Sequence, residues 1–144
     1  PERYVTEMIE IKRQQLQQVK GCQAIVLRDS FLPIYPLAQL LGYDKSAEQQ
    51  HNQVDDIVIT ILCDGKQRIG LAVDQCYQRQ ELFIKDIHQQ LIALPGISGA
   101  SILGDGAVVL ILDVEDIFQL AVKYGAAVNI TSSEAKSTTA RHVA

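Results

Sequence analysis

One stretch, residues 94–114, constrains the fold of this chain more than any other. It reads L-P-G-I-S-G-A-S-I-L-G-D-G-A-V-V-L-I-L-D-V, and Asp105-Gly106 is a dipeptide that two-residue type I′ turns select, because both central positions need φ > 0. A short, largely apolar segment, Ala100 to Leu103, precedes the turn, and an unbroken aliphatic run, Ala107 to Leu112, follows it. A run without polar alternation is typical of a strand buried on both faces. The stretch therefore predicts a β-hairpin whose second strand lies at the centre of a core.

The same residues resemble a known family. The run P-G-I-S-G-A-S-I-L-G-D-G, followed by an apolar strand and D-V, is similar to the signature of the CheW-like domain, closest to the version at the C-terminus of the chemotaxis histidine kinase CheA. The segment Ala24 to Gly42 resembles the family's hairpin and helix, with Asp29 where Gly is usual. The resemblance covers Pro1 to Tyr124. It implies a mainly β fold of two small SH3-like five-stranded barrels that share a core and carry short helices.

Composition agrees with an ordinary folded domain. The chain has 144 residues, of which 47% are hydrophobic and 21% charged, enough for one domain with a real core. A formal net charge of −4 argues against a nucleic-acid or anionic-membrane surface, and we expect neither nucleic-acid binding nor direct membrane insertion. The three cysteines form no C-x-x-C pair and are interpreted as reduced cysteines of a cytosolic core: Cys22, Cys63 and Cys76.

The first third of the chain predicts strands and one short helix. We expect a strand within Pro1 to Ile11 that passes into a turn of helix, a strand at Leu16 to Val19, and two strands, Ala24 to Arg28 and Phe31 to Tyr35, around a turn at Asp29-Ser30. Pro33 lacks an N–H group, so its strand is expected to have an unpaired position on that side, as edge strands do. Pro36 suits the first turn of a helix with three inward leucines that ends at Gly42: Leu37, Leu40 and Leu41.

The middle of the chain predicts a second hairpin. Asp56 to Leu62 and Arg68 to Val73 read as strands joined through Asp64-Gly65, another type I′ signal. The second strand is expected to bend at Gly70 and to continue, half exposed, through Asp74 to Ile84. The polar segment Tyr43 to Asp55 is expected to be a surface loop.

Three carboxylates lie at the end of the 94–114 hairpin and just after it, and their spacing allows two interpretations. Asp113, Glu115 and Asp116 could bind a divalent metal, but the spacing favours helix capping, with Asp113 as N-cap and Asp116 three residues on. The helix is expected to run from Val114 to Tyr124. Residues 125–144 lack periodicity and are expected to form a flexible tail, so the predicted domain spans residues 1–124.

No motif for catalysis or cofactor binding is found: the serines lie outside G-x-S-x-G, and the glycines match neither G-x-G-x-x-G nor the P-loop. The leading hypothesis is a non-catalytic interaction module. The resemblance implies docking to the adaptor CheW and to the cytoplasmic tip of chemoreceptors, and hence a cytoplasmic location at receptor arrays. The alternatives are a free-standing CheW-type adaptor and, less favoured, a small metal-dependent β-barrel enzyme or an oligonucleotide-binding barrel.

The resemblance also implies where partners bind. Matched to the family, Glu10 and Arg28 lie near the receptor-facing groove, and we expect them to form an ion pair. Ile97 and Phe83 are candidates for an exposed apolar contact with the adaptor, with a place in the core as the alternative for either. The family's first strand would lie upstream of Pro1, which leaves an open barrel edge. We expect a partner, a second copy of the chain in a homo-oligomer or strand-swapped dimer, or residues outside this chain to fill it.

Overall fold

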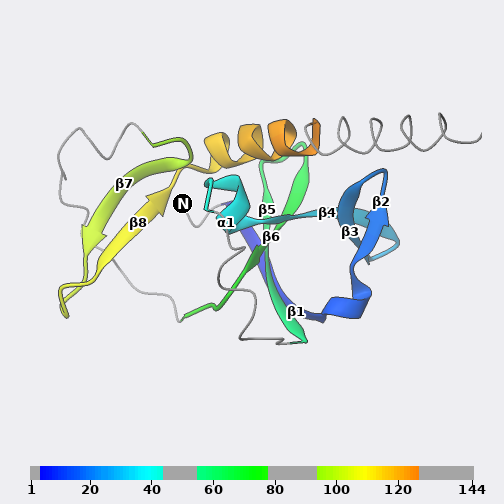
Figure 1. Cartoon of the computed structure of the whole chain (residues 1–144), viewed down its shortest axis with the longest axis horizontal. Coiled ribbons are helices and arrows are strands. Elements are labelled where there is room, and N and C mark those ends of the chain that lie inside the picture. Colours follow the sequence, from blue (N-terminus) through cyan, green and yellow to red (C-terminus); the bar gives the residue numbers. More distant parts are fainter. Residues whose placement is uncertain (1–3, 44–54, 78–93, 127–144) are drawn as a thin grey trace, which may run out of the picture.

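The structure, a computed structural model, describes residues 4–43, 55–77 and 94–126. Most of the described chain is β-strand (Figure 1), which confirms the predicted mainly β class. The helices are the short η2 (Arg13–Gln15) and α1 (Leu37–Leu40) and a longer helix at residues 114–126, drawn in orange. The strands are β1 (Val5–Lys12), β2 (Gln17–Val19), β3 (Cys22–Leu27), β4 (Ser30–Pro36), β5 (Asp56–Cys63), β6 (Arg68–Val73), β7 (Ile97–Ile102) and β8 (Val108–Leu112).

The strands form two sheets. The larger has the order β1-β5-β6-β4-β3-β2, in which β4 and β6 are parallel and the other neighbours antiparallel, and the smaller is the hairpin β7-β8. The two outer strands of the larger sheet, β1 and β2, are joined by η2 alone, and the β3–β4 turn reaches back to β1 through an ion pair. Outer elements can meet in this way only if the sheet curls strongly. The curl agrees with the predicted SH3-like barrels, although hydrogen bonds among the described strands do not close a ring.

Two apolar cores lie on opposite faces of β5 and β6. The inner core is enclosed by the curled sheet and contains Ile11, Ile25, Leu32, Ile34, Ile59 and Ile61. The outer core lies between the sheet, α1 and the 114–126 helix and contains Leu40, Leu62, Ile69, Leu71, Val114, Ile117, Phe118 and Ala121. Because side chains alternate along a strand, β5 supplies both cores in turn. Each fully buried aliphatic side chain contributes about 1.5–3 kcal/mol to folding stability. Both cores depend on the same two strands, because β5 and β6 contribute side chains to each.

The prediction that the aliphatic run Ala107 to Leu112 forms the central strand is wrong. Val108 is 61% exposed, and the rest of β8 is only half-buried. Among the described strands, the largest fully buried apolar side chains belong instead to β4 and β5: Leu32, Ile34, Ile59 and Ile61. An apolar run indicates a strand that could be covered on both faces, but which elements cover it depends on the tertiary arrangement.

Both predicted hairpins are confirmed, but neither has the type I′ turn that was expected. In β7–β8 the N–H of Leu103 donates to the carbonyl of Ala107 at 2.9 Å, and the loop between them has positive φ only at Gly106. The Asp105 carboxylate accepts the N–H of Ala107 at 2.9 Å, which favours this longer loop.

The β5–β6 loop departs from type I′ in the same way. The loop lies between the paired residues Cys63 and Arg68, and only Gly65 has positive φ. Consecutive positive φ values occur instead at Lys20 and Gly21, between β2 and β3, and at Arg28 and Asp29, with 49° and 62°, between β3 and β4. The β3–β4 turn is therefore one residue earlier than predicted.

The unpaired position expected beside Pro33 is present on the β6 side, although β4 as a whole is not an edge strand. β4 is paired on both sides, with β3 through Ala24 and Pro33 and with β6 from Ile34 onward. The ladder to β6 begins one residue after the proline, so the missing N–H removes no bond of that ladder. The long strand expected through Ile84 ends at Val73; residues 74–77 are irregular, and residues 78–84 lie outside the described residues.

The remaining elements follow the predictions closely. The predicted strand is β1, and the turn of helix after it is η2, just beyond the expected Pro1 to Ile11. Gly42, with φ +81°, lies two residues past the end of α1, and the N–H of Asp116 donates to the capping Asp113 carboxylate at 3.1 Å. The last helix continues through residues 125 and 126, beyond the predicted domain boundary, and the rest of the expected tail lies outside the described residues. None of the helices in the described ranges is long and apolar enough to span a membrane.

Candidate functional site

An ion pair joins the tip of the β3–β4 hairpin to β1. The Arg28 guanidinium donates to the Glu7 carboxylate at 2.9 Å, with 66% and 26% of the two side chains exposed. The prediction that Arg28 pairs with Glu10 is therefore wrong. Side chains alternate along β1, so Glu7 shares a face with Ile9 and Ile11 toward the curled side of the sheet, whereas Glu10 lies on the other face.

Exposed apolar side chains accompany this ion pair. Val26 and Phe31 are directly opposite each other on β3 and β4 and are 53% and 62% exposed. The Arg68 guanidinium of β6 donates to the Ser30 hydroxyl of the same hairpin at 3.3 Å, on the face opposite Val26 and Phe31. We call Val26, Arg28, Phe31 and Arg68 the hairpin patch. A second exposed cross-strand pair, Ile102 and Val108, lies next to the β7–β8 turn. Apolar side chains that gather on an exposed surface are typical of protein contact surfaces. The sequence analysis identified neither of these two pairs.

The other sequence-predicted contact residues lie elsewhere. Ile97 begins β7 and is only 6% exposed, so its side chain belongs to the core, the alternative to an exposed contact. A β-branched residue that opens a hairpin packs against the adjoining elements. Phe83 lies outside the described residues.

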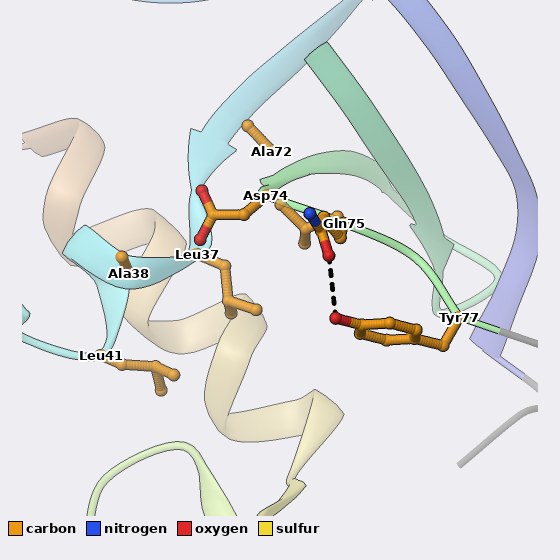
Figure 2. A pocket seen from close by; sticks show the side chains of 8 residues that line it. Leu37, Ala38, Leu41, Ala72, Asp74, Gln75 and Tyr77 are labelled. Carbon is orange, nitrogen blue, oxygen red and sulfur yellow. Dashed lines mark hydrogen bonds between the residues drawn. The ribbon is translucent and has the colours of Figure 1, made fainter. Parts of the chain in front are cut away.

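A pocket of about 460 Å³ opens beside α1 (Figure 2). Leu37, Ala38 and Leu41 line it from the helix, and the end of β6 and the following residues line the other side: Ala72, Val73, Asp74, Gln75 and Tyr77. We call this the α1 pocket. The Tyr77 hydroxyl donates to the Gln75 side-chain oxygen at 2.8 Å across its rim. Leucine, alanine and valine side chains make most of its lining apolar. The sequence analysis missed it, since small residues in apolar segments give no distinct signal.

A smaller, polar cavity of about 190 Å³ lies between α1, β3 and the end of the 114–126 helix. The Tyr124 hydroxyl donates to the Gln39 side-chain oxygen at 2.6 Å, and the Tyr124 ring meets Tyr35 edge-on, with centroids 6.1 Å apart. Burial raises the pKa of the Tyr35 phenol, and the nearby Cys22 thiol adds to the rise. We call Tyr35, Gln39 and Tyr124 the Tyr124 latch, because they fasten the helix to α1 and β4.

The carboxylates after β8 hold the base of the β7–β8 hairpin. The Asp113 N–H donates to the Gly96 carbonyl at 2.8 Å, and the Gly96 N–H donates to the Asp116 carboxylate at 3.3 Å. Together with the N-cap bond, these contacts give both aspartates the structural role that the sequence favoured over metal binding. Within residues 4–43, 55–77 and 94–126, no group of three or more His, Cys, Asp or Glu side chains could hold a metal ion.

Comparison with known proteins places the chain in a family. A family model for the CheW-like domain matches residues 1–122. The chain belongs to the CheW-like domain family. Among its curated relatives, the chemotaxis protein CheA of Treponema pallidum is 30% identical over 83% of this chain, and CheA of Salmonella typhimurium is 31% identical over 76%. The sensor histidine kinase CheAY of Helicobacter pylori is 27% identical over 96% of the chain.

The chain spans a small part of each of these relatives: 14% of the Treponema protein, 16% of the Salmonella protein and 17% of the Helicobacter protein. The resemblance identified from the sequence is therefore confirmed at the level of the CheW-like domain.

Proposed function

We propose that this CheW-like domain is a non-catalytic interaction module that couples a chemotaxis histidine kinase to the adaptor CheW and to the cytoplasmic tip of chemoreceptors. The observation that carries the proposal is the exposed Val26 and Phe31 pair on the β3–β4 hairpin of a chain in this family. The catalytic and phosphoacceptor parts of such a kinase would lie outside this chain. The module would act in the cytoplasm, at the inner face of the membrane.

Two surfaces at opposite ends of β4 and β6 are available for two partners. The hairpin patch lies where these strands begin, and the α1 pocket lies where they end. We assign the hairpin patch to the adaptor, because an exposed apolar pair with guanidinium groups at the same end of the hairpin suits a complementary protein surface. Arg28 there would set the orientation of the partner, since an exposed ion pair contributes at most about 1 kcal/mol to stability.

We assign the α1 pocket to the receptor tip. Its apolar floor suits aliphatic side chains, and Asp74, the charged residue of the lining, favours a basic neighbour beside them. Glu10, which is exposed on β1, and Phe83 remain proposed contacts of these partners, whereas the buried Ile97 would act only by positioning β7. The outer strand β1 offers an additional edge for a second copy of the chain.

Calorimetry with matched truncations tests the assignment of the hairpin patch. We expect Phe31→Ala to weaken binding to CheW at least tenfold, because exposed aromatic anchors dominate such contacts. Val122→Ala is the control, since Val122 is 63% exposed on the 114–126 helix, outside the patch. Arg28→Glu should weaken binding in the same way.

Equal affinity of Phe31→Ala and Val122→Ala for the adaptor would show that the hairpin patch is not the docking surface. Absence of binding to both CheW and a receptor-tip fragment by the folded wild-type chain would overturn the proposed function itself.

A further inference from the structure

Successive side chains of α1 contact different parts of the molecule. Leu37 and Ala38 line the α1 pocket (Figure 2). Gln39 accepts a hydrogen bond from the Tyr124 hydroxyl, and Leu40 is buried in the outer core. Leu41, which caps the helix, lines the pocket as well. A single turn of helix thus lies between a pocket that is open to solvent and the helix at residues 114–126.

The 114–126 helix meets this turn at two places along its length. Near its start, Leu41, Ile117 and Leu120 all approach Gly96, within 3.3 Å of the position that a side chain there would occupy. Near its end, the Tyr124 latch joins it to Gln39 of α1 and Tyr35 of β4. The position of α1 therefore affects both ends of the longer helix.

Few backbone interactions hold α1 in place. It has four residues, and its backbone hydrogen bonds are those of one turn. The N–H groups of residues 41, 42 and 43 donate to the carbonyls of residues 37, 39 and 38, respectively. Isolated turns of helix are unstable because nucleation is costly, so α1 depends on side-chain packing for its order. On its pocket side that packing is incomplete, because the residues that the structure describes leave a volume of about 460 Å³ unfilled.

We propose that α1 couples the α1 pocket to the 114–126 helix: an apolar side chain of a bound partner orders α1 and thereby tightens the Tyr124 latch. The partner is the receptor tip of the proposed function, on which this inference rests. Packing on the open side of α1 reduces the motion of this helix and so lowers the conformational-entropy cost of forming the Tyr124 latch. This effect requires no change in the mean structure. Such coupling is reciprocal, so breaking the latch weakens the binding of any side chain that fills the pocket.

Hydrogen exchange measured on the whole chain tests the coupling without a partner. Gln75→Phe places a ring in the pocket from the side opposite α1, and Gln75→Ala is its matched control, because Gln75 is exposed and already lines the pocket. We expect amide exchange within residues 120–126 to be at least threefold slower in Gln75→Phe than in Gln75→Ala. In a Tyr124→Phe background, which lacks the hydroxyl of the latch, most of this difference should disappear.

A second filling variant, Ala38→Leu, keeps the test decisive if the new ring turns toward solvent. Unchanged or faster exchange at residues 120–126 in both variants would overturn the coupling, as would a slowing that persists fully in Tyr124→Phe. Calorimetry of the wild-type chain with a receptor-tip fragment reports separately on the proposed function. If the receptor-tip fragment binds but amide exchange at residues 120–126 is not slowed in the filling variants, the proposed function stands and the coupling is contradicted.

Discussion

At the scale of the residue, a few close approaches decide how the hairpin, α1 and the last helix meet. Gly96 shows this most clearly, because it has φ +84° and both of its backbone groups bond to the start of the 114–126 helix. A Cβ atom at this position would lie 2.9 Å from a Leu41 methyl group and 3.1 Å from one of Leu120. Both the backbone conformation and the available space therefore require glycine.

Gly96→Ala should lower the free energy of unfolding by about 1–3 kcal/mol, because strain from the positive φ adds to overpacking. Urea denaturation followed by circular dichroism measures the change. Gly104→Ala is the matched control, since no atom lies within 4 Å of a Cβ atom there, and it should stay within about 0.5 kcal/mol of wild type. Equal stability of the two variants would mean that Gly96 is not a close approach.

At the scale of the element, side-chain hydrogen bonds shape the loops. In the β5–β6 loop the Asp64 carboxylate accepts the N–H of Lys66 at 2.8 Å and that of Gln67 at 2.9 Å. These bonds, led by the one from Gln67, lower the pKa of Asp64 below its ordinary value of 3.8. A carboxylate with a lowered pKa stabilises the fold above the pKa of the unfolded chain, and this contribution is lost as the pH falls through the folded pKa.

Asp64→Asn should test this loop through its pH dependence. Asparagine keeps an oxygen for the two N–H groups but carries no charge, so wild type should have the higher melting temperature at pH 7. The difference should shrink below about pH 4, where the unfolded carboxyl is protonated, and vanish once the folded one is protonated as well. Melting temperatures at pH 7, 4 and 2.5 measure it. A constant difference over that range would contradict the charge-based explanation.

The same bonds explain why the sequence predicted the hairpins but not their turns. Aliphatic runs on either side of Asp-Gly suffice to indicate two strands and a reversal, and both hairpins are present. The turn type depends on whether the aspartate side chain bonds the following backbone, which the dipeptide alone does not decide. Likewise, the family resemblance paired Arg28 with Glu10, but the alternation of side chains along β1 places Glu7, not Glu10, on the side that faces Arg28. The α1 pocket depends on segments far apart in sequence and gave no local signal.

At the scale of the whole molecule, the two cores are not independent. Residues of β5 enter the inner core at Ile59 and Ile61 and the outer core at Leu62, and β6 pairs with β5 along its length. Loss of packing on either face would loosen the strands that support the other. We therefore infer that the curled sheet and the helix that covers it form one cooperative unit.

Truncations in the two cores should show this cooperativity. Ile59→Ala in the inner core and Ile117→Ala in the outer core remove fully buried side chains, and each should cost about 2–5 kcal/mol. Each variant should shift one common transition, seen at the same urea concentration by circular dichroism and by tyrosine fluorescence, while the exposed Val122→Ala should leave it within about 0.5 kcal/mol. Two separate transitions, each moved by only one of the core variants, would show instead that the cores unfold independently. The coupling proposed for α1 would then be confined to the outer core, because α1 contributes Leu40 to that core.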